Sequence, residues 1–156
     1  MVGAMDYTPI TFTSSQHPLL TSFGHELVLS IGFESDIQHL ADRPEGYYHL
    51  PDAANWFHKE VSNAWDKTKL IDGYPGMDII IAHQKGNDWY IGGIHAENRE
   101  KSKKLALIFL PEGTKYKLTF IADGSHDKEF SSRYMVVDKF SEVEVKILRR
   151  EVLLLV

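Results

Sequence analysis

Cysteine is absent from the 156-residue sequence. The chain therefore has no disulfide, no thiolate zinc site and no cysteine nucleophile. Without cysteines, the sequence does not indicate whether the chain is found in an oxidising or a reducing compartment. Long apolar runs are missing too, since none approaches the roughly 18 residues that a membrane-spanning helix needs. The first eight residues contain no basic stretch followed by an apolar core. We therefore expect no secretory signal at this end and no membrane partner.

Positive charge is also scarce. Lysine and arginine total 17 against 22 aspartates and glutamates, so the net charge is −5. The two basic clusters, residues 99–104 and 149–150, lie far apart in the sequence. Because such a surface repels phosphate backbones, we expect no nucleic-acid partner. Apolar residues make up 43% of the chain, which at this length allows one domain with a sizeable core.

The pattern changes near residue 70, from helical spacing before it to strand alternation after it. Residues 18–33 place apolar side chains at spacings of three, four and seven, which predicts a buried helix with Pro18 in its first turn. Residues 35–38 have the pattern of a capping box, which predicts a short helix over 36–41. Residues 51–59 predict a third helix, with proline and aspartate in its first turn.

Beyond residue 70, short apolar stretches follow one another between turn signals. They predict strands at 77–84, 88–95, 103–110, 116–120, 133–138, 143–147 and 152–156. Residues 85–87 join the first two strands as a hairpin. Gly92 and Gly93 inside a strand predict a bulge or the close approach of a neighbouring element. Many short strands separated by turns indicate an antiparallel sandwich or barrel.

Motifs of known enzymes and metal sites are missing. The sequence has no G-x-S-x-G, no Walker loop, no H-E-x-x-H and no G-x-G-x-x-G. Eight histidines are scattered without the spacing of metal ligands. Glu34, Asp36 and Asp42 surround a predicted helix end, and we interpret them as caps or surface charges rather than a glycosidase pair. We therefore predict no catalytic residue and no metal site.

Two adjacent aromatic residues are the candidate ligand contacts. Trp89 and Tyr90 fall in one predicted strand, so their side chains point to opposite faces and at least one belongs to the core. Flat aromatic rings also stack on sugars, so the pair remains a candidate contact for an oligosaccharide. Trp56 and Trp65 are predicted to join the helices to the strands.

Several segments resemble one enzyme family. The stretch from Trp65 to Gly76 resembles the W-D-E-T-x-x-L-D-G-x-P-G motif of glycoside hydrolase family 97, which includes bacterial α-glucosidases and α-galactosidases. Residues 79–94 look like the hairpin that follows in the family. Upstream, residues 5–9 and 34–42 are similar to its M-D-Y-T-P and E-S-x-x-Q-x-L-A-D segments. The similarity is collinear over residues 3 to about 124, which makes it more specific than any single motif.

The resemblance implies a mainly β fold with N-terminal helices. Residues 1–62 would form the last loop and helices of a (β/α)₈ catalytic barrel, and residues 63–156 a C-terminal antiparallel β-sandwich. The chain would then be the non-catalytic C-terminal portion of a family 97 α-glycosidase, a sandwich that braces the barrel and mediates oligomerisation. The alternative is a stand-alone carbohydrate-binding module that uses strand aromatics.

The resemblance also implies what the chain lacks. The catalytic and calcium-binding glutamates of the family lie on barrel segments before the M-D-Y-T-P motif, and no position here matches them. We therefore expect a chain that is inactive alone and holds no cofactor or calcium. Asp6 and Tyr7 would lie at the rim of the parent active site. Family members imply a periplasmic or secreted location in bacteria.

Three partners follow from these interpretations. The first is the rest of the glycosidase chain, and the second is another copy that associates through the helix of residues 18–33. The wide apolar face of that helix predicts either self-association or docking onto the sandwich of the same chain. The third is an oligosaccharide held by Trp89 or Tyr90.

Overall fold

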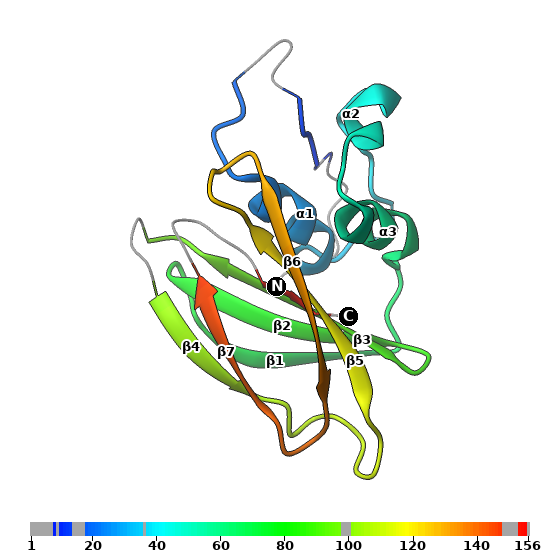
Figure 1. Cartoon of the computed structure of the whole chain (residues 1–156), viewed down its shortest axis with the longest axis vertical. Helices are drawn as coiled ribbons and strands as arrows, with labels where there is room; N and C mark the ends of the chain where they lie inside the picture. Colours follow the sequence, from blue (N-terminus) through cyan, green and yellow to red (C-terminus); the bar gives the residue numbers. More distant parts are fainter. Residues whose placement is uncertain are drawn as a thin grey trace.

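The computed structural model describes residues 8, 10–13, 18–35, 37–97, 101–147 and 153–155. Helices precede strands in the described chain, as predicted (Figure 1). Within this part of the chain, no helix has the length and apolarity needed to traverse a bilayer. The elements are α1 (Phe23–Gly32), α2 (Pro44–Tyr48), α3 (Asp52–Glu60), β1 (Lys67–Tyr74), β2 (Asp78–Lys85), β3 (Asp88–His95), β4 (Lys101–Ala106), β5 (Tyr116–Asp123), β6 (Phe130–Val137), β7 (Glu142–Ile147) and β8 (Leu153–Leu155).

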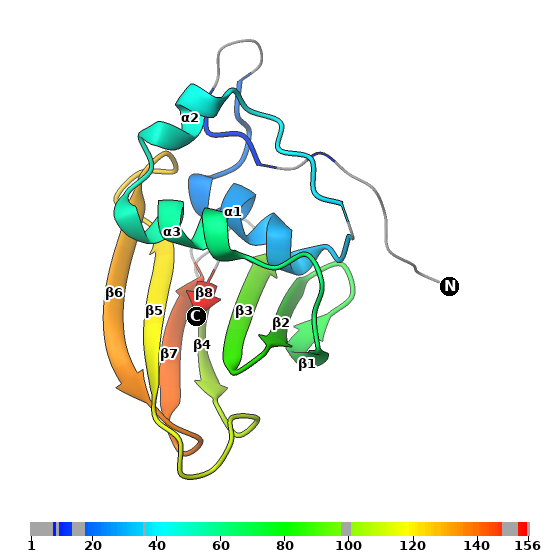
Figure 2. The ribbon, with the colours of Figure 1, turned by 90° about the vertical axis from the view of Figure 1, so that its right-hand side faces the viewer.

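The described strands form two antiparallel sheets. The large sheet has the order β1-β2-β3-β8-β5-β6, and β4 pairs with β7 in a small sheet. Successive side chains of a strand point to opposite faces, and both faces of the central strand β3 are covered. Trp89 and Ile91 pack toward the small sheet, whereas Tyr90 packs in the core on the helix side. Figure 2 shows α1 and α3 lying across one end of the large sheet. The result is three layers with two cores, which confirms the predicted mainly β fold with N-terminal helices and an antiparallel sandwich.

Helix α1 lies directly on strand β3 of the large sheet. Leu27, Val28 and Ile31 are at most 1% exposed. A Cβ atom at Gly92 would lie 2.8 Å from Cγ2 of Val28 and 2.8 Å from Cγ2 of Ile31. The close approach predicted at the glycine pair is therefore confirmed, and the neighbour is the chain's own helix. Of the two alternatives predicted for residues 18–33, docking onto the sandwich of the same chain is confirmed, because the large sheet covers the apolar face of α1.

The first turn of α1 is defined by polar caps. Ser22 is the N-cap, and its hydroxyl accepts a hydrogen bond from the backbone N–H of His25 at 3.1 Å. Oδ1 of Asp123, on β5, accepts another from the backbone N–H of Gly24 at 2.6 Å. The prediction that Pro18 lies in the first turn was wrong. A proline supplies a suitable φ but no acceptor for the free N–H groups of a first turn.

The short helix predicted over residues 36–41 is also wrong, since the described residues 37–41 are not helical. The hydroxyl of Ser35 donates to the carbonyl of Ile37 at 2.6 Å, which makes a local turn. Nε2 of Gln38 donates to the carbonyl of Ser30 at 3.0 Å. Both side chains that suggested a capping box therefore bind backbone carbonyls instead. The second helix begins later, at Pro44.

Most predicted strands are present, with two corrections. Strands β2 and β3 form the predicted hairpin, and α3 matches the third predicted helix. Strand β4 ends at Ala106 because Leu110 N–H bonds to the carbonyl of Leu107 in a turn, at 3.0 Å. Strand β1 was missed. It is an edge strand whose side chains are almost all exposed, so it carries no alternation of apolar and polar residues.

Candidate functional site between the two sheets

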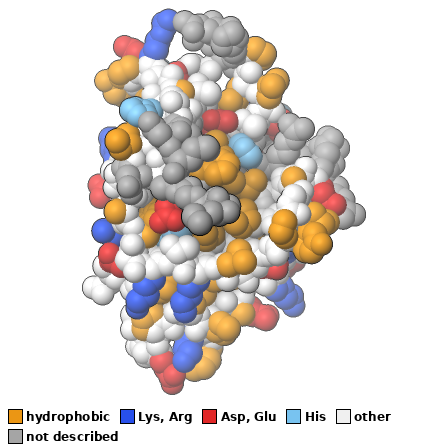
Figure 3. Space-filling view, turned by 180° about the vertical axis from the view of Figure 1, so that it is seen from behind, with side chains coloured by type: hydrophobic (Ala, Val, Ile, Leu, Met, Phe, Trp, Pro, Cys, Tyr) orange, Lys and Arg blue, Asp and Glu red, His pale blue; other side chains and the backbone are white. Residues whose placement is uncertain are grey.

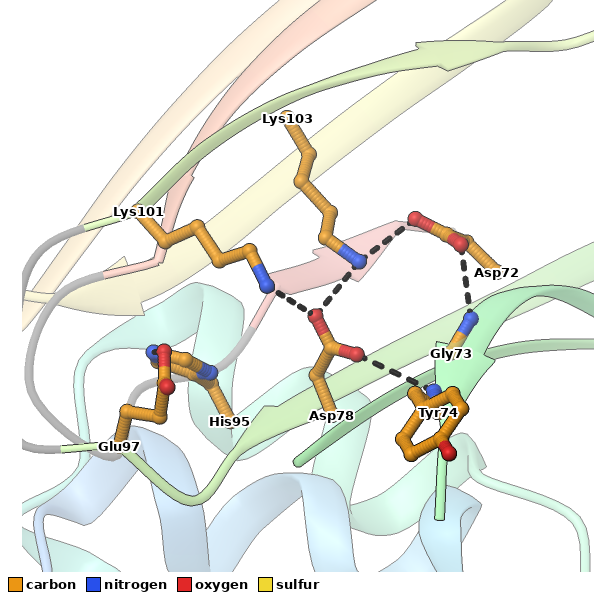
Figure 4. Close-up of polar contacts among 8 residues, drawn as sticks. All are labelled: Asp72, Gly73, Tyr74, Asp78, His95, Glu97, Lys101 and Lys103. Atoms are coloured by element: carbon orange, nitrogen blue, oxygen red, sulfur yellow. Dashed lines mark hydrogen bonds and ion pairs between the residues drawn. The ribbon is translucent and has the colours of Figure 1, made fainter. Parts of the chain in front are cut away.

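A cluster of charged side chains joins the small sheet to one end of the large sheet (Figure 4). Nζ of Lys101 lies 2.8 Å from Oδ2 of Asp78. Nζ of Lys103 lies 2.6 Å from Oδ2 of Asp78 and 2.6 Å from Oδ2 of Asp72. The side chain of Asp78 is 4% exposed and that of Lys103 is 14% exposed. The four charges thus form a network with Asp78 and Lys103 buried at its centre, while the side chains of Lys101 and Asp72 are 30% and 53% exposed.

Strand alternation and a tight hairpin place these groups. Residues 101, 103 and 105 share one face of β4, and Leu105 on that face is part of the sandwich core. Across from them, Oδ1 of Asp78 accepts the backbone N–H of Tyr74 at 3.2 Å. Oδ1 of Asp72 accepts the N–H of Gly73 at 2.8 Å. The β1–β2 hairpin therefore presents both carboxylates to the lysines at the rim of the core.

The pKa shifts of Asp78, Asp72 and Lys103 favour their ionised states. Hydrogen bonds from Lys101 and Lys103 lower the pKa of Asp78 to about 2. The hydrogen bond from Lys103 also lowers the pKa of Asp72. Burial works to lower the pKa of Lys103, but the bonds to both carboxylates raise it overall. A nucleophilic lysine needs a depressed pKa, and the pKa of Lys103 is raised. We therefore interpret the network as a structural contact between the two sheets rather than a reaction centre. The four residues Asp72, Asp78, Lys101 and Lys103 are called the ion-pair lock below.

The lock predicts a defined acid sensitivity. The pKa of Asp78 in the folded chain is about 2, below its ordinary value of 3.8. Its stabilisation is therefore complete well above pH 4 and is lost as the pH falls through 3.8 toward 2. We expect Asp78 to contribute about 2 kcal/mol to the loss of unfolding free energy in that window. Urea unfolding at a series of pH values measures it.

The matched variant for this experiment is Asp78→Asn, which keeps the shape of the side chain and removes the titration. Its unfolding free energy should fall less steeply between pH 4 and 2 than that of the unchanged chain. Identical slopes for the two proteins would show that Asp78 does not hold the sheets together through its charge.

His95 lies beside the lock, at the end of β3. Its side chain is fully buried, and Nε2 lies 3.6 Å from Oε2 of Glu97. Neither ring nitrogen makes a hydrogen bond within the described structure. Among the described residues, no group of three or more histidine, aspartate or glutamate side chains is placed to hold a metal ion.

The structure moves the predicted aromatic contacts into the interior. Trp89 and Tyr90 are each 6% exposed. The Trp89 ring lies 4.9 Å from that of Phe109 in the sandwich core, and the Tyr90 ring lies 5.2 Å from that of Trp65 on the helix side. Neither ring offers a free face, so sugar stacking by this pair is not supported. The sequence showed that one of them is core, but not that both faces of β3 are covered.

The acidic residues singled out in the sequence have separate positions. Asp42 accepts hydrogen bonds from the N–H groups of Phe12 and Thr13, at 2.7 and 2.8 Å, and from the Thr13 hydroxyl. Burial works to raise the pKa of Asp42, but these bonds lower it overall. Glu34 is exposed, and Asp36 lies outside the described residues. Asp42 thus holds the extended segment 10–13, and it is not a helix cap, because α2 begins after Arg43 without a side-chain cap.

Of the two tryptophans predicted to join the helices to the strands, one does so and the other does not. Trp65 joins helices and strands as predicted, since its ring stacks 4.7 Å from that of His83 and packs in the helix-side core. Trp56 does not, because it is 43% exposed. Asp6 and Tyr7, the predicted rim residues, lie outside the described residues.

The sequence analysis missed all four residues of the lock. The available signal was the alternation of Lys101 and Lys103 with Leu105, which puts two cations on a core-facing side of a strand. A cation in that position needs a partner. The partners could not be named, because Asp72 and Asp78 lie on a hairpin whose first strand was not recognised.

An open groove lies next to the lock, between β1 and β4. It has a volume of about 690 Å³. Two large apolar side chains on its walls are strongly exposed, Leu70 at 66% and Ile108 at 71%. On the face shown in Figure 3, basic side chains lie beside acidic and apolar ones. The walls of the β1–β4 groove combine exposed apolar side chains with the charged side chains of Lys69, Asp72 and Lys104.

Comparison with known proteins identifies one family. A family model described as glycosyl-hydrolase 97 C-terminal, oligomerisation, matches residues 64–151. A probable retaining α-galactosidase from Streptomyces bingchenggensis is 42% identical over 96 residues, which are 62% of this chain and 15% of that protein. A retaining α-galactosidase from Bacteroides thetaiotaomicron is 38% identical over 69 residues, 44% of this chain and 10% of that protein. The chain thus corresponds to a small part of the length of these curated relatives.

Solved structures share the fold. A glycoside hydrolase family 97 enzyme from Pseudoalteromonas sp. strain K8, in complex with acarbose, superposes with a TM-score of 0.88 at 24% identity, over 98% of this chain and 26% of that one. A β-arabinopyranosidase gives a TM-score of 0.77 at 22% identity, over 90% of this chain and 22% of that one. At these identities the likeness establishes the fold, and it includes the helices as well as the sandwich.

Proposed function

The chain belongs to the glycosyl-hydrolase 97 C-terminal family, and on that premise we propose that it is the non-catalytic, self-associating portion of a family 97 α-galactosidase. The observation that carries the proposal is the family match, which spans β1 to β7 and whose description is oligomerisation. The substrate class is taken from the two relatives, which are both described as retaining α-galactosidases.

A bracing role is supported by the way the helices join the sandwich. Nε2 of His83, on β2, lies 3.0 Å from the carbonyl of Ile31 at the end of α1. A carbonyl only accepts, so Nε2 carries the hydrogen and Nδ1 accepts from the Thr68 hydroxyl at 2.8 Å. Burial lowers the pKa of His83, which favours this neutral form. The imidazole ring of His83 thus connects α1, β2 and β1. Through it the position of α1 is coupled directly to the large sheet.

For self-association, we propose that a second copy covers the β1–β4 groove. The apolar face of α1 is already buried, so another surface must serve. Strand β1 is the edge of the large sheet, and an edge strand presents unpaired backbone groups to any strand that approaches. Leu70 on β1 and Ile108 beside β4 add exposed apolar area to that edge. Exposed apolar groups next to an open strand edge are what an interface between identical chains requires.

Charge reversal in the groove tests this surface. Leu70→Glu combined with Ile108→Glu places two like charges on an apolar contact, and a symmetric interface contains each substitution twice. We expect the self-association constant to fall at least about tenfold, equivalent to 1.4 kcal/mol. Sedimentation equilibrium of the full chain measures it.

Leu20→Glu is the matched control, because Leu20 is 80% exposed and lies outside the groove. It should leave the association unchanged. Equal association of the doubly substituted chain and the unchanged chain would refute the groove as the interface. In the same samples, the chain alone should not hydrolyse p-nitrophenyl α-galactoside above the blank, and turnover would refute the non-catalytic role.

A further inference from the structure

A second hollow lies on the helix side of the large sheet, away from the β1–β4 groove. It has a volume of about 500 Å³, within the range of small-molecule sites. Helix α3 forms one wall, the start of β3 another, and β5 with β6 the floor. The side chains that line this α3 cleft and enter the argument are Asp52, Trp56, Asp88, Lys117, Thr119 and Tyr134.

The cleft lies near the start of β3 and of β5, at Asp88 and Lys117. Farther along the same face of β5, Ile121 is covered by the helix-side core and is 1% exposed. The helix-side core therefore covers one end of this face, whereas Asp88 and Lys117 at the other end are exposed.

Two aromatic rings remain exposed at this hollow. Trp56 is 43% exposed and Tyr134 is 57% exposed. Tyr134 pairs across the strands with Thr119, so both share the floor. Nζ of Lys117 lies 4.6 Å from the centre of the Tyr134 ring, a cation–π contact that restrains the ring. The cleft thus offers two flat apolar faces, one of them held in place.

The polar groups of the cleft select among ligands. Asp52 and Asp88 are acceptors, Lys117 is a donor, and the Thr119 hydroxyl is both. Two carboxylates against one lysine disfavour an anion. Ala53 is the single aliphatic side chain among the residues that line the cleft, which disfavours a purely apolar ligand or a hydrophobic helix. Flat apolar faces beside both donors and acceptors match the faces and hydroxyl groups of a pyranose ring.

We propose that the α3 cleft is a binding site for a short neutral oligosaccharide. Trp56 and Tyr134 take the role that the sequence analysis gave to the buried Trp89 and Tyr90. The cleft is defined by this chain's own residues, whereas the choice of an α-galactoside as its ligand rests on the proposed function. On that function, a sandwich that holds glycan in this cleft would keep substrate near the enzyme to which it is attached.

The test is a titration of the full chain with melibiose, followed by the three tryptophan indole N–H signals in a ¹H–¹⁵N spectrum. The signal of Trp56 should shift saturably, whereas that of the buried Trp89 should not. Tyr134→Ala should weaken binding and raise the dissociation constant at least tenfold. Tyr74→Ala is the matched control, since Tyr74 is 67% exposed but lies on β1, and it should change nothing.

Three results would each overturn the proposal. One is the absence of a saturable shift at Trp56 up to sugar concentrations of about 50 mM, well beyond the millimolar range of weak ligands. The second is an equal shift in the Tyr134→Ala variant, and the third is an equal shift with the acyclic polyol sorbitol in place of melibiose. The groove variant Leu70→Glu should bind melibiose normally, which separates this result from the outcome of the self-association experiment.

Discussion

Replacing Gly92 with valine is expected to reduce the free energy of unfolding by about 3 kcal/mol, the upper part of the range for overpacked cores. A Cβ at this position would already lie 2.8 Å from side-chain atoms of both Val28 and Ile31, and valine adds two more methyl groups. Valine is otherwise a favourable residue in a strand. A loss of stability would therefore report the clash with α1. Urea denaturation measures it.

A double-mutant cycle with Val28→Ala is the control for this prediction. Val28→Ala alone should cost about 2 kcal/mol through the cavity it leaves. In the double variant the smaller side chain makes room for part of the new valine, so the combined loss should fall short of the sum by about 1 kcal/mol. Strictly additive losses would contradict the packing of α1 onto β3.

Replacing Asp123 with alanine is the second change with a large expected effect, about 2 kcal/mol of unfolding free energy. Asp123 is 5% exposed, and its carboxylate accepts the backbone N–H of Gly24 in the first turn of α1. Such a charge at a helix N-terminus is stabilised by the helix dipole as well as by the hydrogen bond. Alanine removes both and leaves a buried N–H group without this acceptor.

Asp123→Asn separates the two contributions, because its side-chain oxygen still accepts the bond but carries no charge. It should lose less stability than Asp123→Ala. Asp127→Ala is the matched control, since Asp127 is exposed and only its backbone carbonyl accepts a bond from Phe23, at 2.7 Å. Thermal unfolding of the three variants ranks them. A cost for Asp127→Ala equal to that for Asp123→Ala would contradict the specific role of the buried carboxylate.

Both predictions concern the contact between the helices and the sandwich. Gly92 provides the space for α1, and Asp123 anchors its first turn, so the helical segment and the large sheet form one packed body. A module that braces a larger enzyme needs this continuity, because separate helices would transmit no restraint. The division predicted between residues 62 and 63 stays a prediction, and in space the helix-side core extends across it.

Sequence alone determined the element types and the family. Periodicity is local, so residues 51–59 and 88–95 revealed a helix and a strand without knowledge of the rest. Collinear motifs from Trp65 onward identified glycoside hydrolase family 97, and the family match confirms it. The sequence pattern did not predict edge strand β1, because an exposed strand needs no alternation of apolar and polar residues.

Only the tertiary structure decided which groups meet. The cap on α1 comes from Asp123, which is 99 residues away from Gly24, and the partners of Lys101 and Lys103 come from a different sheet. The same holds for the aromatic rings. Trp89 and Tyr90 became core because layers cover both faces of β3, while Trp56 and Tyr134 stayed exposed where the covering stops. Burial and long-range pairing depend on how the layers stack, and no local pattern in the chain contains that information.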